Sequence, residues 1–154
     1  CLPTAIRHVP LAALTLMPFI ALALARGPAA ACADPEYNPL NSSFGLVTSP
    51  GTSAAEELQQ LLPNSKVIKA FNTTFAADFS TPVINGKQAD AFIAGNDEEA
   101  LQTVSELVTT AGFNPIVAGD LSVSRILENM QLLLIQLGLK YNYNWLAGWK
   151  ILHN

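Results

Sequence analysis

The chain has 154 residues, of which half are hydrophobic and 13% are charged, and its mean hydropathy is +0.29. Because soluble domains carry about 25% charged residues, it is unusually apolar, and the composition excludes an intrinsically disordered protein. A net charge of −4 argues against a nucleic-acid partner, since phosphates select basic surfaces. The two cysteines, Cys1 and Cys32, are too few for a disulfide framework or a zinc site.

The first 36 residues form an apolar leader of uncertain origin. Residues 1–33 contain no acidic side chain and only two arginines, and two prolines break their apolar run at 9–25. The run is short for a membrane span, which needs about 20 residues. Two alternatives stay open: a secretory signal ending at the Ala-Cys-Ala of 31–33, or a segment foreign to the downstream fold. A genuine signal would imply export; otherwise we expect a cytoplasmic protein.

Residues 37–154 show an alternating pattern of helices and strands. Ser53 and Glu56 have capping-box spacing and open a helix that ends at Pro63. A strand is predicted at 66–71, a loop at 72–88 and a second strand at 89–94.

Asn96 is the expected cap of the next helix, which carries acidic residues in its first turn and ends before a left-handed Gly112. A third strand is predicted at 113–119, and Asp120 caps a long apolar helix reaching about residue 137. The aromatic tail at 141–152 is expected to pack against the domain. The long helix that follows Asp120 is so apolar that it needs cover on more than one side, and this predicts a homo-oligomer formed through that helix.

Helices that alternate with strands predict an α/β domain with a parallel sheet between layers of helices. Ligands of such sheets bind beyond the carboxyl ends of the strands. These ends fall at residues 72–74, 95–97 and 119–120, where we expect a site.

Binding suits these ends better than acid–base catalysis does. The only histidines are His8 and His153, no metal-ligand spacing is present, and the Gly-rich phosphate-binding motifs are absent. Asn72 and Thr73, with Phe75 nearby, could hold a planar ring that bears an amide, or they could merely form the turn after a strand. Hydride transfer fits a site without histidine, because the cofactor supplies the chemistry.

Five blocks in a fixed order carry a resemblance to a known family. They are Asn-Pro-Leu-Asn at 38–41, Gly-Thr-Ser-Ala-Ala-Glu-Glu at 51–57, Val-Ile-Lys-Ala-Phe-Asn-Thr at 67–73, Ala-Asp-Ala-Phe-Ile-Ala-Gly at 89–95 and Ala-Gly-Asp-Leu-Ser-Val-Ser-Arg-Ile-Leu-Glu at 118–128. Together they resemble the later part of the Rossmann-type domain of the NADP oxidoreductases dependent on coenzyme F-420, a deazaflavin. The reductase domain of the STEAP metalloreductases is similar.

The resemblance implies hydride transfer between NADP(H) and a deazaflavin or flavin, and it implies roles for ten residues. Three would approach the cofactor from the first block: Asn38, Pro39 and Asn41. Four would lie at the nicotinamide: Ala70, Phe71, Asn72 and Thr73. The second ring would be faced by Asn72 together with Phe75, Leu121 and Arg125, although Arg125 could equally hold the start of its helix.

The chain also departs from the family, whose members begin with a strand, a Gly-rich turn that holds the pyrophosphate, a helix and a second strand. We therefore predict an incomplete Rossmann-like three-layer domain with weak or absent NADP(H) binding. Its strand edge should be exposed and the fragment marginal or self-associating, unless the apolar leader packs into the gap. Three functions stay open: an oxidoreductase module, truncated and impaired; a non-catalytic remnant or interaction module; and an exported small binding protein. The sequence leaves open whether the chain is an enzyme.

Overall fold

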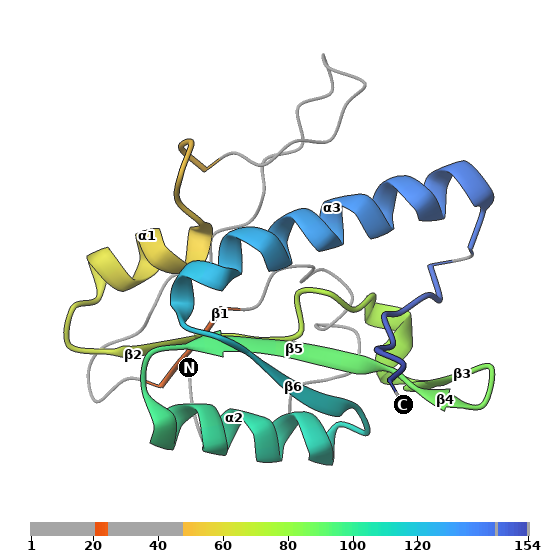
Figure 1. Cartoon of the computed structure of the whole chain (residues 1–154), viewed down its shortest axis with the longest axis horizontal. Coiled ribbons are helices and arrows are strands. Elements are labelled where there is room, and N and C mark those ends of the chain that lie inside the picture. The colour runs from red at the N-terminus through yellow and green to blue at the C-terminus, as the bar shows by residue number, and fades with distance from the viewer. Residues whose placement is uncertain (1–20, 25–47, 144, 154) are drawn as a thin grey trace.

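A computed structural model describes residues 21–24, 48–143 and 145–153. They form a mixed sheet with helices on both faces, which confirms the predicted α/β class (Figure 1). The strands are β1 (Ala21–Leu24), β2 (Lys66–Lys69), β3 (Val83–Ile84), β4 (Lys87–Gln88), β5 (Asp90–Gly95) and β6 (Asn114–Gly119). The helices are α1 (Ala54–Leu61), α2 (Glu98–Thr110) and α3 (Ser124–Tyr141), with short 3-10 turns η3 (Ala76–Phe79) and η4 (Leu121–Val123).

The main sheet has the strand order β1-β2-β5-β6, and it is not all parallel as the sequence predicted. β5 and β6 are parallel because α2 carries the chain back between them. β2 is antiparallel to β5, with Ile68 opposite Gly95. The connection between them holds a 3-10 turn and a small hairpin in place of a crossover helix, so the chain returns in the opposite direction.

β1 comes from the apolar N-terminal segment and lies along β2. The two strands are antiparallel, with Ala21 opposite Lys69 and Leu24 opposite Lys66. The edge of β2 is thus paired with backbone from this segment, and β6 forms the other edge of the described sheet. The other predictions for the leader, and those for residues 38, 39 and 41 of the domain, fall outside the described residues.

Side chains alternate along β5 between two cores. Ala91 and Ile93 face α2 and pack in the cluster that contains Val104. Phe92 and Ala94 point to the opposite face, where Leu127 of α3 covers them. Figure 1 shows α2 below the sheet and α1 and α3 above it, which gives the three layers that the sequence predicted.

Two helix starts differ from the prediction: that of α2, and that of α3, which begins at Ser124 because Asp120 caps the 3-10 turn η4 instead. Ser53 caps α1 and accepts a bond from the backbone N–H of Glu56, as predicted. α2 is capped by Asp97, whose carboxylate accepts from the N–H of Ala100 at 2.9 Å. Asn96, the expected cap, lies one residue before Asp97, and its side-chain oxygen accepts a bond from the backbone N–H of Leu121 instead.

The aromatic tail was predicted to pack against the domain, and it does so in part: the buried carboxylate of Asp90 holds it, while most of its large side chains are exposed. Asp90 accepts bonds from the Lys150 ammonium at 2.7 Å and the Ile151 N–H at 2.6 Å, and also from the Asn114 amide at 2.7 Å. The ring of Trp145 meets Phe75 edge to face at 5.5 Å. α3 keeps several large apolar side chains exposed on its outer side: Ile126, Leu133, Leu139 and Tyr141. None of the described helices is both long and apolar enough to cross a membrane.

Asp78 should make stability depend on pH. Burial raises the pKa of this carboxyl to about 6, although the backbone N–H groups of Phe75 and Ala147 partly oppose the shift. An unfolded aspartate ionises near about 4, so between these values the folded chain binds more protons and becomes more stable as the pH falls. We expect wild type, relative to Asp78→Asn, to gain about 1 kcal/mol of unfolding free energy from pH 7 to pH 5. Urea denaturation at pH 7 and at pH 5 measures this gain in both proteins. The same pH dependence of stability in wild type and Asp78→Asn would contradict the prediction.

Candidate functional site

The predicted site divides into two places because β2 runs antiparallel to β5. The carboxyl ends of the parallel strands β5 and β6 meet at one end of the sheet, where the side chain of Asn96 bonds Leu121. The carboxyl end of β2, with Asn72 and Thr73, lies at the opposite end. Of the three strand ends predicted to converge, the structure brings together two.

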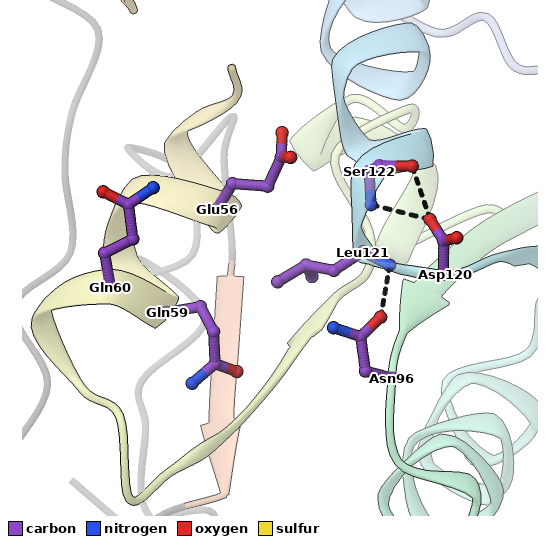
Figure 2. Close-up of a pocket in the computed structure, with 7 residues that line it drawn as sticks. All are labelled: Glu56, Gln59, Gln60, Asn96, Asp120, Leu121 and Ser122. Atoms are coloured by element: carbon purple, nitrogen blue, oxygen red, sulfur yellow. Dashed lines mark hydrogen bonds between the residues drawn. The ribbon is translucent and has the colours of Figure 1, made fainter.

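A pocket of about 360 Å³ opens at the carboxyl ends of β5 and β6. It lies between α1, the loop before α2 and the turn that leads into α3 (Figure 2). The Oδ1 of Asn96 accepts a bond from the backbone N–H of Leu121 at 2.9 Å and so holds the two loops together. The pocket is lined by Glu56, Gln59, Gln60, Asn96, Asp120, Leu121 and Ser122.

Two carboxylates give this pocket its charge. Glu56 accepts two bonds from the Arg125 guanidinium, at 2.6 and 2.8 Å, which lower the pKa of its carboxyl. Asp120 bonds the hydroxyl and the N–H of Ser122, and these bonds lower the pKa of Asp120. Both groups are therefore ionised at neutral pH, and only Glu56 is neutralised by a direct ion pair.

The pocket does not fit the phosphates of a dinucleotide. Nearby Lys66 is paired with Asp97 at 2.9 Å and with Glu99 at 3.4 Å, so its charge is also balanced. The described residues that line the pocket include no basic side chain, so a phosphate group would meet the Asp120 carboxylate without a compensating charge from them. The pocket suits hydroxyl and amide groups instead.

Asn96→Ala should loosen the pocket with a modest loss of stability. The substitution leaves the Leu121 N–H at the start of η4 without its acceptor. We expect the free energy of unfolding to fall by about 0.5–1.5 kcal/mol, measured by chemical denaturation. Asn129→Ala is the matched control, because the Asn129 amide bonds only a carbonyl of its own helix. Equal stability of the Asn96 variant and wild type would show that this bond does not fix the loop.

The second place lies at the end of β2, where the backbone makes a sharp turn. Phe71 has a φ of 59°, a left-handed conformation that is rare for a bulky residue. Its buried ring is fixed against Phe79 and Phe113, at centroid distances of 5.2 and 6.1 Å, and Thr74 bonds its carbonyl at 2.8 Å. Such held strain concentrates at functional sites.

The turn sends the following residues along α3. The side-chain amide of Asn72 donates to the Leu127 carbonyl at 2.8 Å. Further along, the ring of Phe75 lies 3.7 Å from where a Cβ on Gly138 would stand. The four residues predicted at the nicotinamide, together with Phe75, all lie on one continuous segment whose side chains are buried.

The remaining predicted residues lie elsewhere. Leu121 is buried at the pocket, and the side chain of Arg125 is half exposed and engaged with Glu56. This ion pair ties the first turn of α3 to α1, and the predicted place of Arg125 at the second ring stays a prediction. Leu121 lies in η4 and Arg125 in the first turn of α3, whereas the 70–75 segment meets α3 at Leu127.

Sequence reasoning missed the polar face that α3 turns toward this segment. Lys69 and Glu128 form a buried ion pair at 2.8 Å, and Glu128 also accepts from the Ala54 N–H at 3.2 Å. Ser124 and Gln131 are fully buried on the same helix. Their spacing of three and four residues was a usable signal, because it places 124, 128 and 131 on one face.

The sequence predicts no metal site, and that absence stays a prediction. Among the residues at 21–24, 48–143 and 145–153, no group of three or more His, Cys, Asp or Glu side chains could hold a metal ion.

The described fold and its strand-end pocket define a Rossmann-like α/β unit, and comparisons with known proteins agree. The chain is 38% identical over 112 residues to an F-420-dependent NADP reductase of Methanocaldococcus jannaschii, covering 67% of this chain and 48% of that protein. It is 36% identical over 83 residues to Metalloreductase STEAP3 of Rattus norvegicus, covering 54% of this chain and 17% of that protein. No protein-family profile matches.

A crystal structure from Arthrobacter sp. FB24, assigned as an F-420-dependent NADP reductase, superposes with a TM-score of 0.68 at 26% identity. The match covers 75% of this chain and 52% of that one. The resemblance to the F-420-dependent NADP oxidoreductases and the STEAP metalloreductases is thereby confirmed. The chain spans about half the length of the reductases it matches.

Proposed function

We propose that this chain is a module of an NADP-dependent oxidoreductase that transfers hydride between NADP(H) and a deazaflavin, coenzyme F-420, or a related flavin. The support is its similarity to proteins named F-420-dependent NADP reductases, together with the α/β fold that it shares with one of them. The nicotinamide supplies the hydride when it is bound. The protein's task is to place and orient two rings and to exclude water.

The single observation that carries this proposal is the strained, buried turn at the end of β2. Phe71 fixes the backbone there, so that Asn72 and Thr73 stand against α3 with polar atoms that lack partners. An amide-bearing ring fits these atoms, because an amide offers both a donor and an acceptor. Ala70 adds a fully buried small side chain beside the turn. Asn38, Pro39 and Asn41 complete the proposed cofactor set and stay a prediction.

We further propose that NADP(H) binding by this chain is weak. Residues 48–143 contain no Gly-rich turn of the kind that holds a pyrophosphate, and the pocket at β5 and β6 is acidic. Affinity would then come mostly from the ring and little from the phosphates. Self-association through the exposed side of α3 is part of the same proposal.

Titration of the 154-residue chain with NADPH and, separately, with coenzyme F-420 tests this function. We expect both to bind, NADPH with a dissociation constant above about 0.1 mM because phosphate contacts are few. Binding of neither at millimolar concentration would reject the oxidoreductase proposal and favour the non-catalytic interaction module. Micromolar binding of NADPH would reject the proposed weakness and imply another phosphate site.

A further inference from the structure

Of the seven buried polar side-chain atoms without hydrogen-bond partners among the described residues, five lie on two elements that touch where Asn72 bonds Leu127. They belong to four residues whose side chains are fully enclosed: Asn72, Thr73, Ser124 and Gln131. Two of these follow β2, and two lie on the buried face of α3. Folded proteins leave few buried polar groups unsatisfied, since each one is costly. Five such atoms at one contact indicate a polar partner.

Gln131 stands in the middle of this contact. Asn72 is bonded to the Leu127 carbonyl, one helical turn before Gln131, and Phe75 meets α3 beside Gly138, two turns after it. The segment from 72 to 75 therefore runs along the helix across the position of Gln131. Both polar atoms of the Gln131 amide, Oε1 and Nε2, lack partners.

The side-chain amide of Gln131 limits the chemical groups that could be its partner. Its side chain offers one acceptor beside one pair of donors, in a fixed plane. The complementary group is a planar amide edge, in which a carbonyl oxygen lies beside an N–H. Both the carboxamide of a nicotinamide and the pyrimidinedione edge of a deazaflavin have this edge.

We propose that Gln131 is the residue that recognises the amide edge of a bound ring, with Asn72, Thr73 and Ser124 beside it. This inference rests on the proposed function and adds a specificity-determining residue outside the five sequence blocks. Because Gln131 is enclosed, the ring edge reaches it when the 72–75 segment and α3 separate.

Gln131→Leu tests this proposal, with Gln136→Leu as the matched control on the exposed side of the same helix. In the ligand-free chain we expect Gln131→Leu to melt at or above the wild-type temperature, because it removes two unsatisfied polar atoms and keeps the volume. We expect its affinity to fall about tenfold or more for NADPH or for coenzyme F-420, followed by ligand-observed NMR. Gln136→Leu should bind both as wild type does.

The two ligands distinguish the sources of the amide edge. If Gln131→Leu loses affinity for NADPH alone, Gln131 recognises the carboxamide of the nicotinamide. If the variant loses affinity for coenzyme F-420 alone, Gln131 recognises the pyrimidinedione of the deazaflavin. Unchanged affinity for both overturns the inference and leaves the proposed function standing. A lowered melting temperature of ligand-free Gln131→Leu also overturns it, because Gln131 would then have a partner within the protein. If the wild-type chain binds neither ligand, the proposed function and this inference fail together.

Discussion

Glu128→Ala is expected to lower the free energy of unfolding by about 3–5 kcal/mol, the usual cost of removing one partner of a buried ion pair. The Glu128 carboxylate lies 2.8 Å from the Lys69 ammonium, and both side chains are at most 2% exposed. Burial lowers the pKa of Lys69, while the attraction of Glu128 opposes that shift. Removing the carboxylate takes away this attraction and also the acceptor of the Ala54 N–H, which ties α1 to α3.

Urea denaturation measures this loss, and Glu99→Ala is the control. Glu99 also pairs with a lysine, at 3.4 Å from Lys66, but its side chain is 90% exposed. We expect the control to change stability by no more than about 0.5 kcal/mol. The double variant Lys69→Met/Glu128→Leu should recover most of the loss, because apolar groups replace both charges. A Glu128→Ala variant as stable as the control would show that the pair is not buried in solution.

Asp90→Ala should cost about 2–4 kcal/mol and release the C-terminal tail from the sheet. Although burial alone raises the pKa of this carboxyl, the bonds from Lys150, Ile151 and Asn114 bring it below its usual value. The contribution of Asp90 is therefore present above the pKa of an unfolded aspartate, near about 4, and is lost as the pH falls below it.

Limited proteolysis of the tail, together with urea denaturation at pH 7, checks this prediction. Lys150→Met serves as the comparison, because it leaves Asp90 with two of its three donors and a smaller loss is expected. Cleavage after residue 143 should be faster in the Asp90 variant than in wild type. Equal cleavage rates would show that the carboxylate does not hold the tail.

Local signals in the sequence predicted most elements of the fold. Ser53 and Glu56 mark the start of α1, and Gly112 has the left-handed φ of 90° expected after α2. The hairpin of β3 and β4 was missed within the predicted loop. Its turn residues, Asn85 and Gly86, both have positive φ and form the Asn-Gly pair that favours such turns, so the signal was present.

The direction of β2 could not be predicted in this way. Strand direction depends on how the 70–89 connection crosses the sheet, and its length alone allows either a crossover or a return. Because β2 runs antiparallel to β5, Asn72 and Asn96 follow strand ends at opposite ends of the sheet, and the predicted site is divided. The predicted segment at 70–73 does form one buried unit, which its continuity in sequence made predictable.

The polar face of α3 was hidden for a different reason. Lys69 and Glu128 are 59 residues apart, and charged side chains on a helix usually face solvent. Only the three-dimensional structure shows that Gln131 is fully buried, one helical turn from the Leu127 carbonyl that Asn72 bonds. The contacts that define the site are long-range, whereas the signals read from sequence are local.

Hydride transfer between NADP(H) and a deazaflavin is the function that we propose for this chain. The most direct test mixes the chain with millimolar NADPH, deuterated at C4 of the nicotinamide, and coenzyme F-420, and follows the deuterium by mass spectrometry. We predict slow, protein-dependent appearance of deuterium in the reduced deazaflavin. Reduction no faster than in a protein-free mixture would contradict the claim.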